Sequence, residues 1–425
     1  MTTLDTTYIP TAIPTPQQLA FQDWEFGLFL HFGIRTFYEG HRDWDGKPMS
    51  PAAFNPTSLD CDQWARVAQE AGMKYIVFTA KHHDGFANWP SRCTDFSVAS
   101  TPWQGGHGDV VREFTDACHR HDLKVGLYYS PAEWGSPTYE NPKEYDDYFI
   151  RQVSELMTGY GEINMLWFDG CGSEGHEYDW PRIIGEIRRM QPNILIFNMG
   201  DPDYRWVGNE AGIAPLPCWN TVEAVPVSIN TDQLEATADA QPQWLPAECD
   251  CRMREVNWFY SDADEHTVKS LDELMGLYYY SIGRGCNLLI NIGPDRRGLL
   301  PDKDAARLLE FGAEIRRRFG HPLATLSDCR PAEQGWECSL QQPRFIDHAM
   351  IQEDLTTGEH VRRFALEVTS AYGGAPIVVY EGRNIGHKAI CRFPPIKARN
   401  VRLTIREADG LVRIRALELH YARRP

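Results

Sequence analysis

The sequence predicts an α/β fold in which a (β/α)8 TIM-like barrel is followed by a small antiparallel β-sandwich. From about residue 20 to residue 320, short apolar runs alternate with amphipathic segments. The apolar runs end in polar or charged residues, whereas the stretch beyond residue 322 alternates apolar and polar residues with a period of two. We therefore expect a barrel domain at residues 1–322 and a sandwich domain at residues 323–425.

The barrel strands are expected at continuous apolar runs, which are typical of parallel strands buried on both faces. Such runs begin at Phe26, Tyr75, Val125, Ile163, Ile194 and Asn287. About 300 residues of alternating strands and helices suit one (β/α)8 barrel. A doubly wound sheet is the alternative, but it needs a glycine-rich phosphate loop after its first strand. The first run instead ends HFGIRTF, with a single glycine, so the barrel is favoured.

Amphipathic helices are expected between these strands. Apolar residues at Trp64, Val67, Ala68 and Ala71 have helical spacing, and Gly72 follows as a C-cap. Further helices are expected after the N-cap Asp109, over the stripe from Tyr145 to Tyr160, and after the capping box of Ser270 and Glu273. The segment at residues 201–264 has weaker periodicity, which predicts long loops around shorter strands.

The sandwich is expected from four alternating stretches near the C-terminus. These are HVRRFALEVTS, PIVVYEG, NVRLTIREA and RIRALELHYA, and residues such as Gly, Pro, Asn and Asp separate them. Alternation of this kind is typical of antiparallel strands that bury one face.

The composition excludes several classes of function. The net charge of −17 disfavours nucleic acid and anionic membranes as partners. The longest apolar runs are too short to cross a bilayer, and no signal peptide is visible in MTTLDTTYIPTAIPTPQQ. We expect a cytoplasmic protein, or a secreted one if a leader has been removed. The eleven scattered cysteines contain no CxxC pair, which predicts reduced thiols and no zinc site.

Polar side chains gather where the predicted barrel strands end, which is where active sites of this fold lie. His31 ends the first run, His82 and His83 end the second, Tyr128 lies in the third and Asp169 ends the fourth. Neighbouring residues on a strand point to opposite sides, so His82 and His83 do not readily share one metal ion. No HxH or HExxH spacing occurs, and we expect neither a metal nor a cofactor.

The aromatic residues suggest a sugar as ligand. The chain has 13 Trp, 18 Tyr and 19 Phe, several of them beside His, Asp or Glu. Glycoside hydrolysis needs two carboxyl groups, one as nucleophile or base and one as acid. Asp169 suits the first role. For the second the loop-rich stretch offers Asp201, Asp203, Glu210, Glu223, Asp232, Glu235, Asp239 and Glu248, and spacing alone does not choose among them.

The motifs together resemble glycoside hydrolase family 29, the retaining α-L-fucosidases. They are HFG at His31, KHHDGF at Lys81, GLYYSPAEW at Gly126, LWFDG at Leu166, WVGNEAG at Trp206 and NLLINIGPDRRG at Asn287. They span the predicted barrel in the family's order. The stretch YEGRNIGHKAICRF at Tyr380 resembles the sandwich that follows the barrel in this family.

The resemblance implies a role for each matching residue. It implies that Asp169 is the nucleophile and that Glu210 is the general acid/base. It also implies a substrate-binding set made of His31, Asp43, Trp44, His82, His83, Tyr128, Arg254 and Trp258. The resemblance further implies that Arg254 is the arginine of the sugar-binding site and that Trp258 lies beside the C6 methyl group of fucose.

The motif around Glu210 resembles the subgroup that cleaves α-1,3- and α-1,4-linked fucose, so we expect a fucosylated oligosaccharide or glycoconjugate as substrate. SPAEW is closer to the broad-specificity subgroup, and Asp43 replaces a glutamate that is common in the family. A broad-specificity fucosidase and a glycosidase for another L-hexose are therefore alternatives. A non-catalytic glycan-binding protein is a third, and the oligomeric state is left open.

Overall fold

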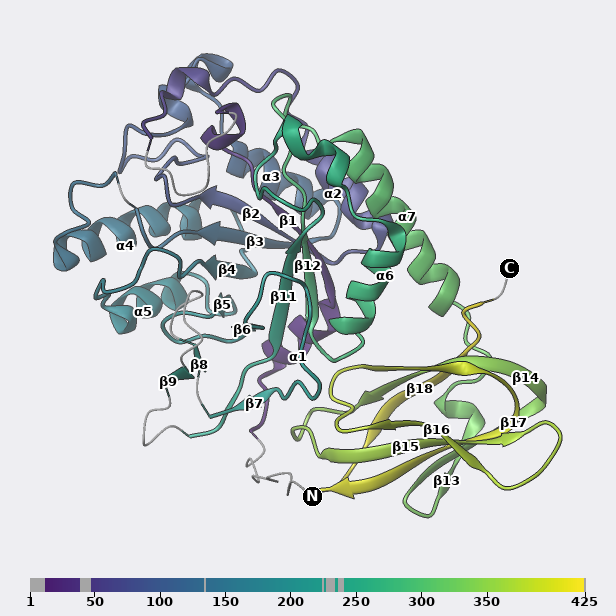
Figure 1. Ribbon diagram of the computed structural model, residues 1–425. Coiled ribbons are helices and arrows are strands. Elements are labelled where there is room, and N and C mark those ends of the chain that lie inside the picture. Colours follow the sequence, from purple (N-terminus) through teal and green to yellow (C-terminus); the bar gives the residue numbers. More distant parts are fainter. Residues whose placement is uncertain are drawn as a thin grey trace.

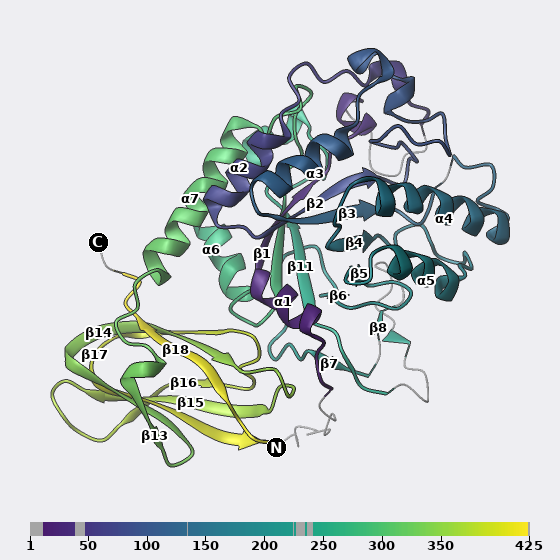
Figure 2. The same cartoon turned by 180° about the vertical axis from the view of Figure 1, so that it is seen from behind.

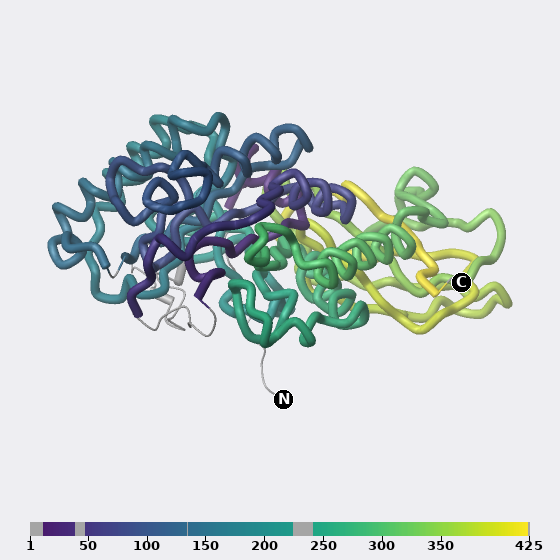
Figure 3. The backbone as a smooth tube through the Cα atoms, turned by 90° about the horizontal axis from the view of Figure 1, so that it is seen from above, coloured from purple at the N-terminus to yellow at the C-terminus, as the bar shows by residue number. Residues whose placement is uncertain are grey.

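A computed structural model describes residues 12–38, 47–133, 135–223 and 241–423, together with the backbone of residues 225–226 and 234–235. A barrel and a β-sandwich lie side by side (Figure 1). Seen from above, they form an elongated molecule with one domain at each end (Figure 3). In the described residues, no helix combines the length and the apolar character needed to span a membrane.

The barrel sheet has eight strands in the order β5-β4-β3-β2-β1-β12-β11-β6, and every neighbouring pair is parallel. Its strands are β1 (Phe26–Leu30), β2 (Tyr75–Lys81), β3 (Lys124–Tyr129), β4 (Met165–Phe168), β5 (Leu195–Phe197), β6 (Arg205–Trp206), β11 (Ala247–Arg252) and β12 (Asn287–Asn291). Phe197 on β5 forms a parallel bridge with Tyr204, which directly precedes β6. This bridge joins the two edges of the sheet and closes the barrel.

Helices cover the outside of the barrel (Figure 2). They are α2 (Cys61–Ala71), α3 (Val110–Arg120), α4 (Pro142–Gly159), α5 (Trp180–Met190), α6 (Leu271–Tyr280) and α7 (Asp302–Phe319). The helix α1 (Pro16–Trp24), which precedes β1, instead contributes Phe21 to the core inside the barrel, against the rings of Tyr75 and Tyr204. The expected caps are confirmed at Gly72, which has a left-handed φ of 93°, and at Asp109, which accepts from the Arg112 N–H. In the described residues no α-helix follows β5 or β6, so two of the seven crossovers between consecutive barrel strands are made by loops there.

The loop-rich stretch after β6 holds the short strands that its weak periodicity predicts. They are β7 (Thr221–Val222), β8 (Val225–Pro226), β9 (Leu234–Glu235) and β10 (Gln243–Trp244). Short 3-10 helices lie in other loops, at Ile34–Phe37, Pro51–Ala53, Val98–Ser100, Trp103–Gly106, Asp262–Thr267 and Leu326–Asp328.

Strand β11 was not predicted from the continuous apolar runs, because charged residues alternate along it. Glu248 and Asp250 are both buried, whereas Cys249 and Cys251 between them join the core under the helices. Because strand side chains alternate between faces, the acidic pair lies inside the barrel. There Trp167 and Tyr75 each donate a hydrogen bond to Glu248.

The sandwich is built from β13 (Cys329–Ala332), β14 (Gly335–Glu353), β15 (Val361–Ser370), β16 (Ile377–Gly382), β17 (Ala389–Ala408) and β18 (Ile414–His420). The strand order is β13-β14-β17-β15-β16, β18 pairs with β14, and all pairs are antiparallel. The long strands β14 and β17 change register twice along their shared ladder, at irregularities where such strands bend.

One pair of cysteines departs from the expected reduced thiols. Cys329 and Cys338 face each other on β13 and β14 and form a disulfide. The other nine cysteines are free. The sequence did not predict this disulfide, because the two cysteines become neighbours only through the hairpin that joins their strands.

The sandwich packs against the end of the barrel at which the strands begin. Glu25, one residue before β1, accepts a hydrogen bond from Lys388 at 2.6 Å and lies 3.0 Å from His387 Nε2. Burial alone would raise the pKa of Glu25, but these two partners lower it to about 2. The opposite end of the barrel, where the strands end, is therefore left for the candidate site.

Candidate active site

Five of the side chains expected at the site meet at the barrel mouth. His31 follows β1, His82 and His83 follow β2, Tyr128 lies at the end of β3, and Asp169 follows β4. The His31 ring lies 5.7 Å from that of His82 and 5.6 Å from that of Tyr128, and the rings of His82 and His83 are 4.2 Å apart. The strand-end pattern thus identified residues that converge in space.

Three donors surround the Asp169 carboxylate. The Tyr128 hydroxyl donates to Oδ2 at 2.7 Å, the Cys171 N–H donates to Oδ1 at 2.9 Å, and His83 Nε2 lies 3.4 Å from Oδ2. Burial alone would raise the pKa of Asp169, but His83 and the donors lower it below its usual value. The side chain keeps 16% of its surface exposed, so an ionised carboxylate faces the mouth.

The partners of His83 require both of its ring nitrogens to carry a proton. The Ser130 hydroxyl donates to the Ala132 carbonyl at 2.7 Å, so its oxygen accepts from His83 Nδ1–H at 2.6 Å. On the other side, Nε2 faces Asp169, whose ionised carboxylate only accepts. Burial opposes a charge on His83, yet Asp169 raises the pKa of His83 to about 9. His83 is therefore an imidazolium at neutral pH.

His31 is held as a neutral ring in one tautomer. Asn291, the last residue of β12, donates through Nδ2 to the Trp258 carbonyl at 2.7 Å, so its Oδ1 faces His31 Nδ1 at 2.7 Å. An amide oxygen only accepts, so the proton of His31 is on Nδ1. Burial lowers the pKa of His31 to about 3 despite this hydrogen bond. Nε2 is left to accept a hydrogen bond from a hydroxyl group.

His82 brings an unsatisfied polar atom to the site. Its ring stacks on Tyr128 with centroids 5.4 Å apart, and Phe259 packs edge-on against it at 5.1 Å. Nδ1 is buried and has no hydrogen-bond partner among the described residues. Burial lowers the pKa of His82 well below its usual value, so the ring is neutral. An unpaired buried polar atom is costly unless a ligand satisfies it.

Glu210 lies at the rim of the barrel, after β6. Arg252 at the end of β11 donates to Glu210 Oε2 at 3.1 Å, and the guanidinium of Arg252 also lies 5.0 Å above the Trp258 ring. Trp258 in turn lies 5.0 Å from the His31 ring, so this chain of contacts links Glu210 to the histidine cluster. The Glu210 side chain is 45% exposed. A carboxyl group in this position can exchange protons with solvent or with a leaving group.

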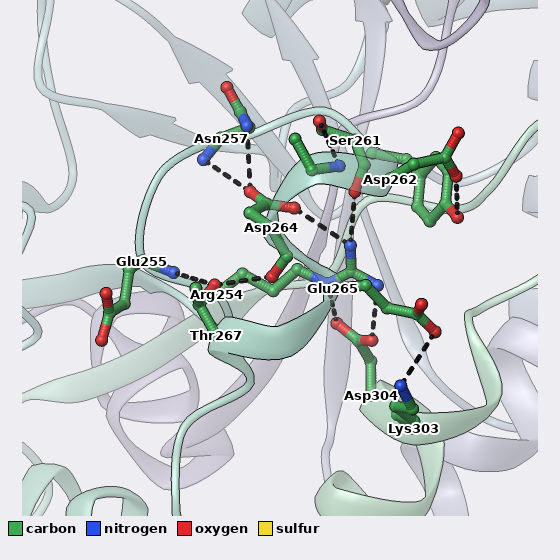
Figure 4. A network of polar contacts seen from close by, with 12 residues as sticks. Arg254, Glu255, Asn257, Ser261, Asp262, Asp264, Glu265, Thr267, Lys303 and Asp304 are labelled. Atoms are coloured by element: carbon green, nitrogen blue, oxygen red, sulfur yellow. Dashed lines mark hydrogen bonds and ion pairs between the residues drawn. The ribbon is translucent and has the colours of Figure 1, made fainter.

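Arg254 does not take the place expected for a site arginine. It donates through Nε and Nη2 to both oxygens of Asp304, at 2.9 and 2.8 Å, and through Nη1 to Asp264 and to the Ser261 carbonyl. Figure 4 shows the guanidinium enclosed by these partners. Arg254 anchors the loop after β11 to α7, and Arg252, two residues earlier, is the arginine beside Glu210.

We expect Arg254→Gln to act on stability more than on chemistry. It leaves Asp304 and Asp264 buried without their cation, which lowers the free energy of unfolding by about 3–5 kcal/mol. Denaturant titration measures this loss. Arg252→Gln is the matched control, because its partly exposed ion pair contributes at most about 1 kcal/mol. Stability losses of equal size in the two variants would contradict the assignment.

The charge on His83 predicts a pH dependence. Asp169 raises the pKa of His83 above the usual value of 6.5. The ion pair therefore stabilises the folded protein fully at pH values below about 6.5. This contribution is lost as the pH rises through about 9. We expect an NMR titration of His83 to have its midpoint near 9 in the wild type and clearly lower in Asp169→Asn, where the carboxylate no longer opposes the effect of burial. The same midpoint in both proteins would contradict the pairing.

Several residues of the site were not identified from the sequence. Ser130 orients His83, Asn291 orients His31, Arg252 holds Glu210, and Phe259 packs against His82. Asn291 ends β12, which the sequence predicted, so the strand-end rule could have found it. Arg252 ends β11, which was not recognised as a strand, so the rule could not reach it. Asp43 and Trp44 lie outside the described residues. No cluster of three or more potential metal ligands occurs in the described ranges.

Comparisons with a family model, with known proteins and with solved structures all find similarity to α-L-fucosidases or to glycoside hydrolase family 29. The sequence model of the α-L-fucosidase family matches residues 6–318. α-L-Fucosidase 1 of Arabidopsis thaliana is 31% identical over 434 residues, covering 93% of this chain and 85% of the plant protein. The crystal structure of a glycoside hydrolase 29 family member from a rumen bacterium superposes with a TM-score of 0.88 at 34% identity, over 98% of this chain and 79% of that one. A Ruminococcus gnavus GH29 fucosidase in complex with fucose, at 24% identity and a TM-score of 0.83, shares the fold over 98% of this chain and 97% of its own.

Proposed function

The chain belongs to the α-L-fucosidase family of glycoside hydrolases, and we propose from this premise that it is a retaining exo-α-L-fucosidase. In this proposal it removes terminal α-1,3/1,4-linked L-fucose from glycans or glycoconjugates. The observation that carries the proposal is the ionised Asp169 carboxylate, aligned by Tyr128, His83 and the Cys171 N–H beside two neutral histidines. An anionic nucleophile among hydrogen-bonding groups for sugar hydroxyls suits glycosyl transfer.

The reaction follows as a double displacement. An Asp169 oxygen forms a bond to C1 of fucose while the C1–O bond to the leaving group breaks and Glu210 gives that oxygen its proton. In the second step Glu210 takes a proton from water, whose oxygen attacks C1 and releases Asp169. The His83 imidazolium and the Tyr128 hydroxyl keep Asp169 ionised between turnovers, and Arg252 holds Glu210 at the rim where the leaving group departs.

The protonation states of His31 and His82 indicate how the sugar is recognised. His31 Nε2 and the unsatisfied Nδ1 of His82 can bond ring hydroxyls, whereas Trp258 and Phe259 offer apolar surface to the C6 methyl group. One methyl group in an apolar pocket decides only about 1–3 kcal/mol. The hydroxyl contacts therefore supply most of the selectivity for fucose over another L-hexose.

The linkage preference is tested by comparing two natural substrates. The WVGNEAG motif around Glu210 supports the α-1,3/1,4 preference, so a Lewis-type trisaccharide should be hydrolysed with a kcat/KM well above that of a 2-linked fucoside. An aryl α-L-fucoside serves as the control for intact chemistry. Equal kcat/KM values on the two glycans would favour the broad-specificity alternative, and a preference for another aryl L-hexoside would favour a different sugar.

A further inference from the structure

A cavity of about 260 Å³ lies where α6 meets the sandwich. One wall comes from α6 and the turn after it, where Gly276, Tyr280 and Arg284 recur on one face. The opposite wall comes from the sandwich and includes Tyr380 and Arg392. This junction is at the end of the barrel where the strands begin, so the cavity is remote from Asp169 at the strand ends.

The charge of the cavity is unusual for this protein. None of its lining residues is acidic, whereas the whole chain carries a net charge of −17. Arg284 donates to the Ala214 carbonyl and lies over the Tyr280 ring at 4.6 Å, and Arg392 is exposed beside the Tyr279 ring at 5.9 Å. Neither guanidinium has a carboxylate partner among the described residues. Two cations therefore face one cavity with no anion to balance them.

The cavity is preformed and partly apolar. Its two walls are joined by the hydrogen bond from Ile390 N–H to the Gly283 carbonyl at 3.0 Å and by the backbone bridge between Arg284 and Ala389. A side chain on Gly276 would meet no atom within 4 Å at its Cβ, so the helix leaves open space there. At the rim, Tyr280 is 47% exposed. Rigid walls lower the entropy cost of binding a small ligand.

We propose that this junction cavity binds a pyranose ring that bears an oxyanion, such as the carboxylate of a uronic acid or a sulfate group. Guanidinium groups bind planar or tetrahedral oxyanions through charge-assisted hydrogen bonds. Tyrosine faces suit the C–H surface of a sugar ring, and the volume suits a single ring. The cavity would hold an acidic unit of a glycan while the mouth of the barrel remains open to fucose. Binding in this cavity is independent of the catalytic roles of Asp169 and Glu210.

Calorimetric titration of the full-length protein tests the site with a matched pair of probes. Methyl β-D-glucuronide and methyl β-D-glucoside share one ring and differ only in the C6 carboxylate. We expect the glucuronide to bind at least about tenfold more tightly than the glucoside, and glucose 6-sulfate to compete with it. Saturating L-fucose should leave this affinity unchanged, because fucose occupies the other end of the barrel.

Two variants test whether the glucuronide binds in this cavity. Arg392→Gln removes one cation from the wall, and Gly276→Trp fills the open space, so each should weaken glucuronide binding at least about tenfold. Arg383→Gln is the matched control, because this exposed arginine lies between the lining residues Gly382 and Asn384 without lining the cavity itself.

Three results would overturn the proposal. They are no detectable glucuronide binding, equal affinity for the neutral glucoside, and equal losses in Arg392→Gln and Arg383→Gln. Inorganic sulfate that binds as tightly as glucose 6-sulfate would overturn the sugar-ring part. Hydrolysis of an aryl α-L-fucoside is measured in parallel, so a failure of the proposed catalytic function is seen separately.

Discussion

Asp169→Asn should reduce kcat on an aryl α-L-fucoside by roughly 10⁴-fold or more, because it removes the atom proposed to attack C1. The amide is nearly isosteric with the carboxylate and still accepts through its oxygen, so the fold and the fucose pocket should persist. Steady-state kinetics give the loss, and calorimetry with L-fucose shows whether binding remains.

A second aspartate–histidine pair supplies the control for this variant. Asp347 lies 2.7 Å from His348 in the sandwich, far from the mouth of the barrel. Asp347→Asn should therefore leave turnover near the wild-type level. Near-normal activity of Asp169→Asn would contradict the nucleophile assignment, and loss of fucose binding would show that the variant disturbs the pocket as a whole.

Glu210→Ala should have an effect that depends on the leaving group. On a natural glycan, whose alkoxide leaving group needs a proton, the loss of general acid catalysis should cost about 10²–10⁴-fold in kcat/KM. On a fucoside with an acidic phenol as leaving group, the first step needs no proton, so its kcat/KM should fall far less. The ratio of the two losses is the measurement.

Glu223→Ala is the matched control, because Glu223 is an exposed carboxylate of the same loop-rich stretch. We expect it to lower neither rate appreciably and to show no dependence on the leaving group. Equal losses on both substrates for Glu210→Ala would argue against the acid role. They would leave Glu210 as a residue that only orients Arg252.

The sequence predicted those parts of the molecule that depend on local pattern. Continuous apolar runs identified six of the eight barrel strands, and the polar residues that end them include His31, His82, His83 and Asp169. This worked because parallel strands place their carboxyl ends at one face of the barrel. Strand β11 was missed because Glu248 and Asp250 interrupt its apolar character. Their pKa values are both raised by burial, that of Glu248 to about 7.

Contacts between residues far apart in the chain were not accessible from the sequence. Asn291 sets the tautomer of His31 across 260 positions, and only the closed barrel brings them together. Arg252 and Arg254 both belong to ECDCRMREVNWFY, and the bond to Asp304 across 50 positions decides which one is buried away from the mouth. The junction cavity likewise depends on how the sandwich packs against α6, for which no local motif exists.

The most direct test of the double-displacement account is to trap the covalent intermediate. A 2-deoxy-2-fluoro-α-L-fucosyl fluoride slows both steps, but its good leaving group allows the first to proceed, so the fucosyl-enzyme should accumulate. Peptide mapping by mass spectrometry then locates the label. Attachment of one fluorofucosyl group to Asp169, in the peptide containing LWFDG, is the predicted result. Turnover without any labelled protein, or a label on a different carboxylate, would contradict the central claim.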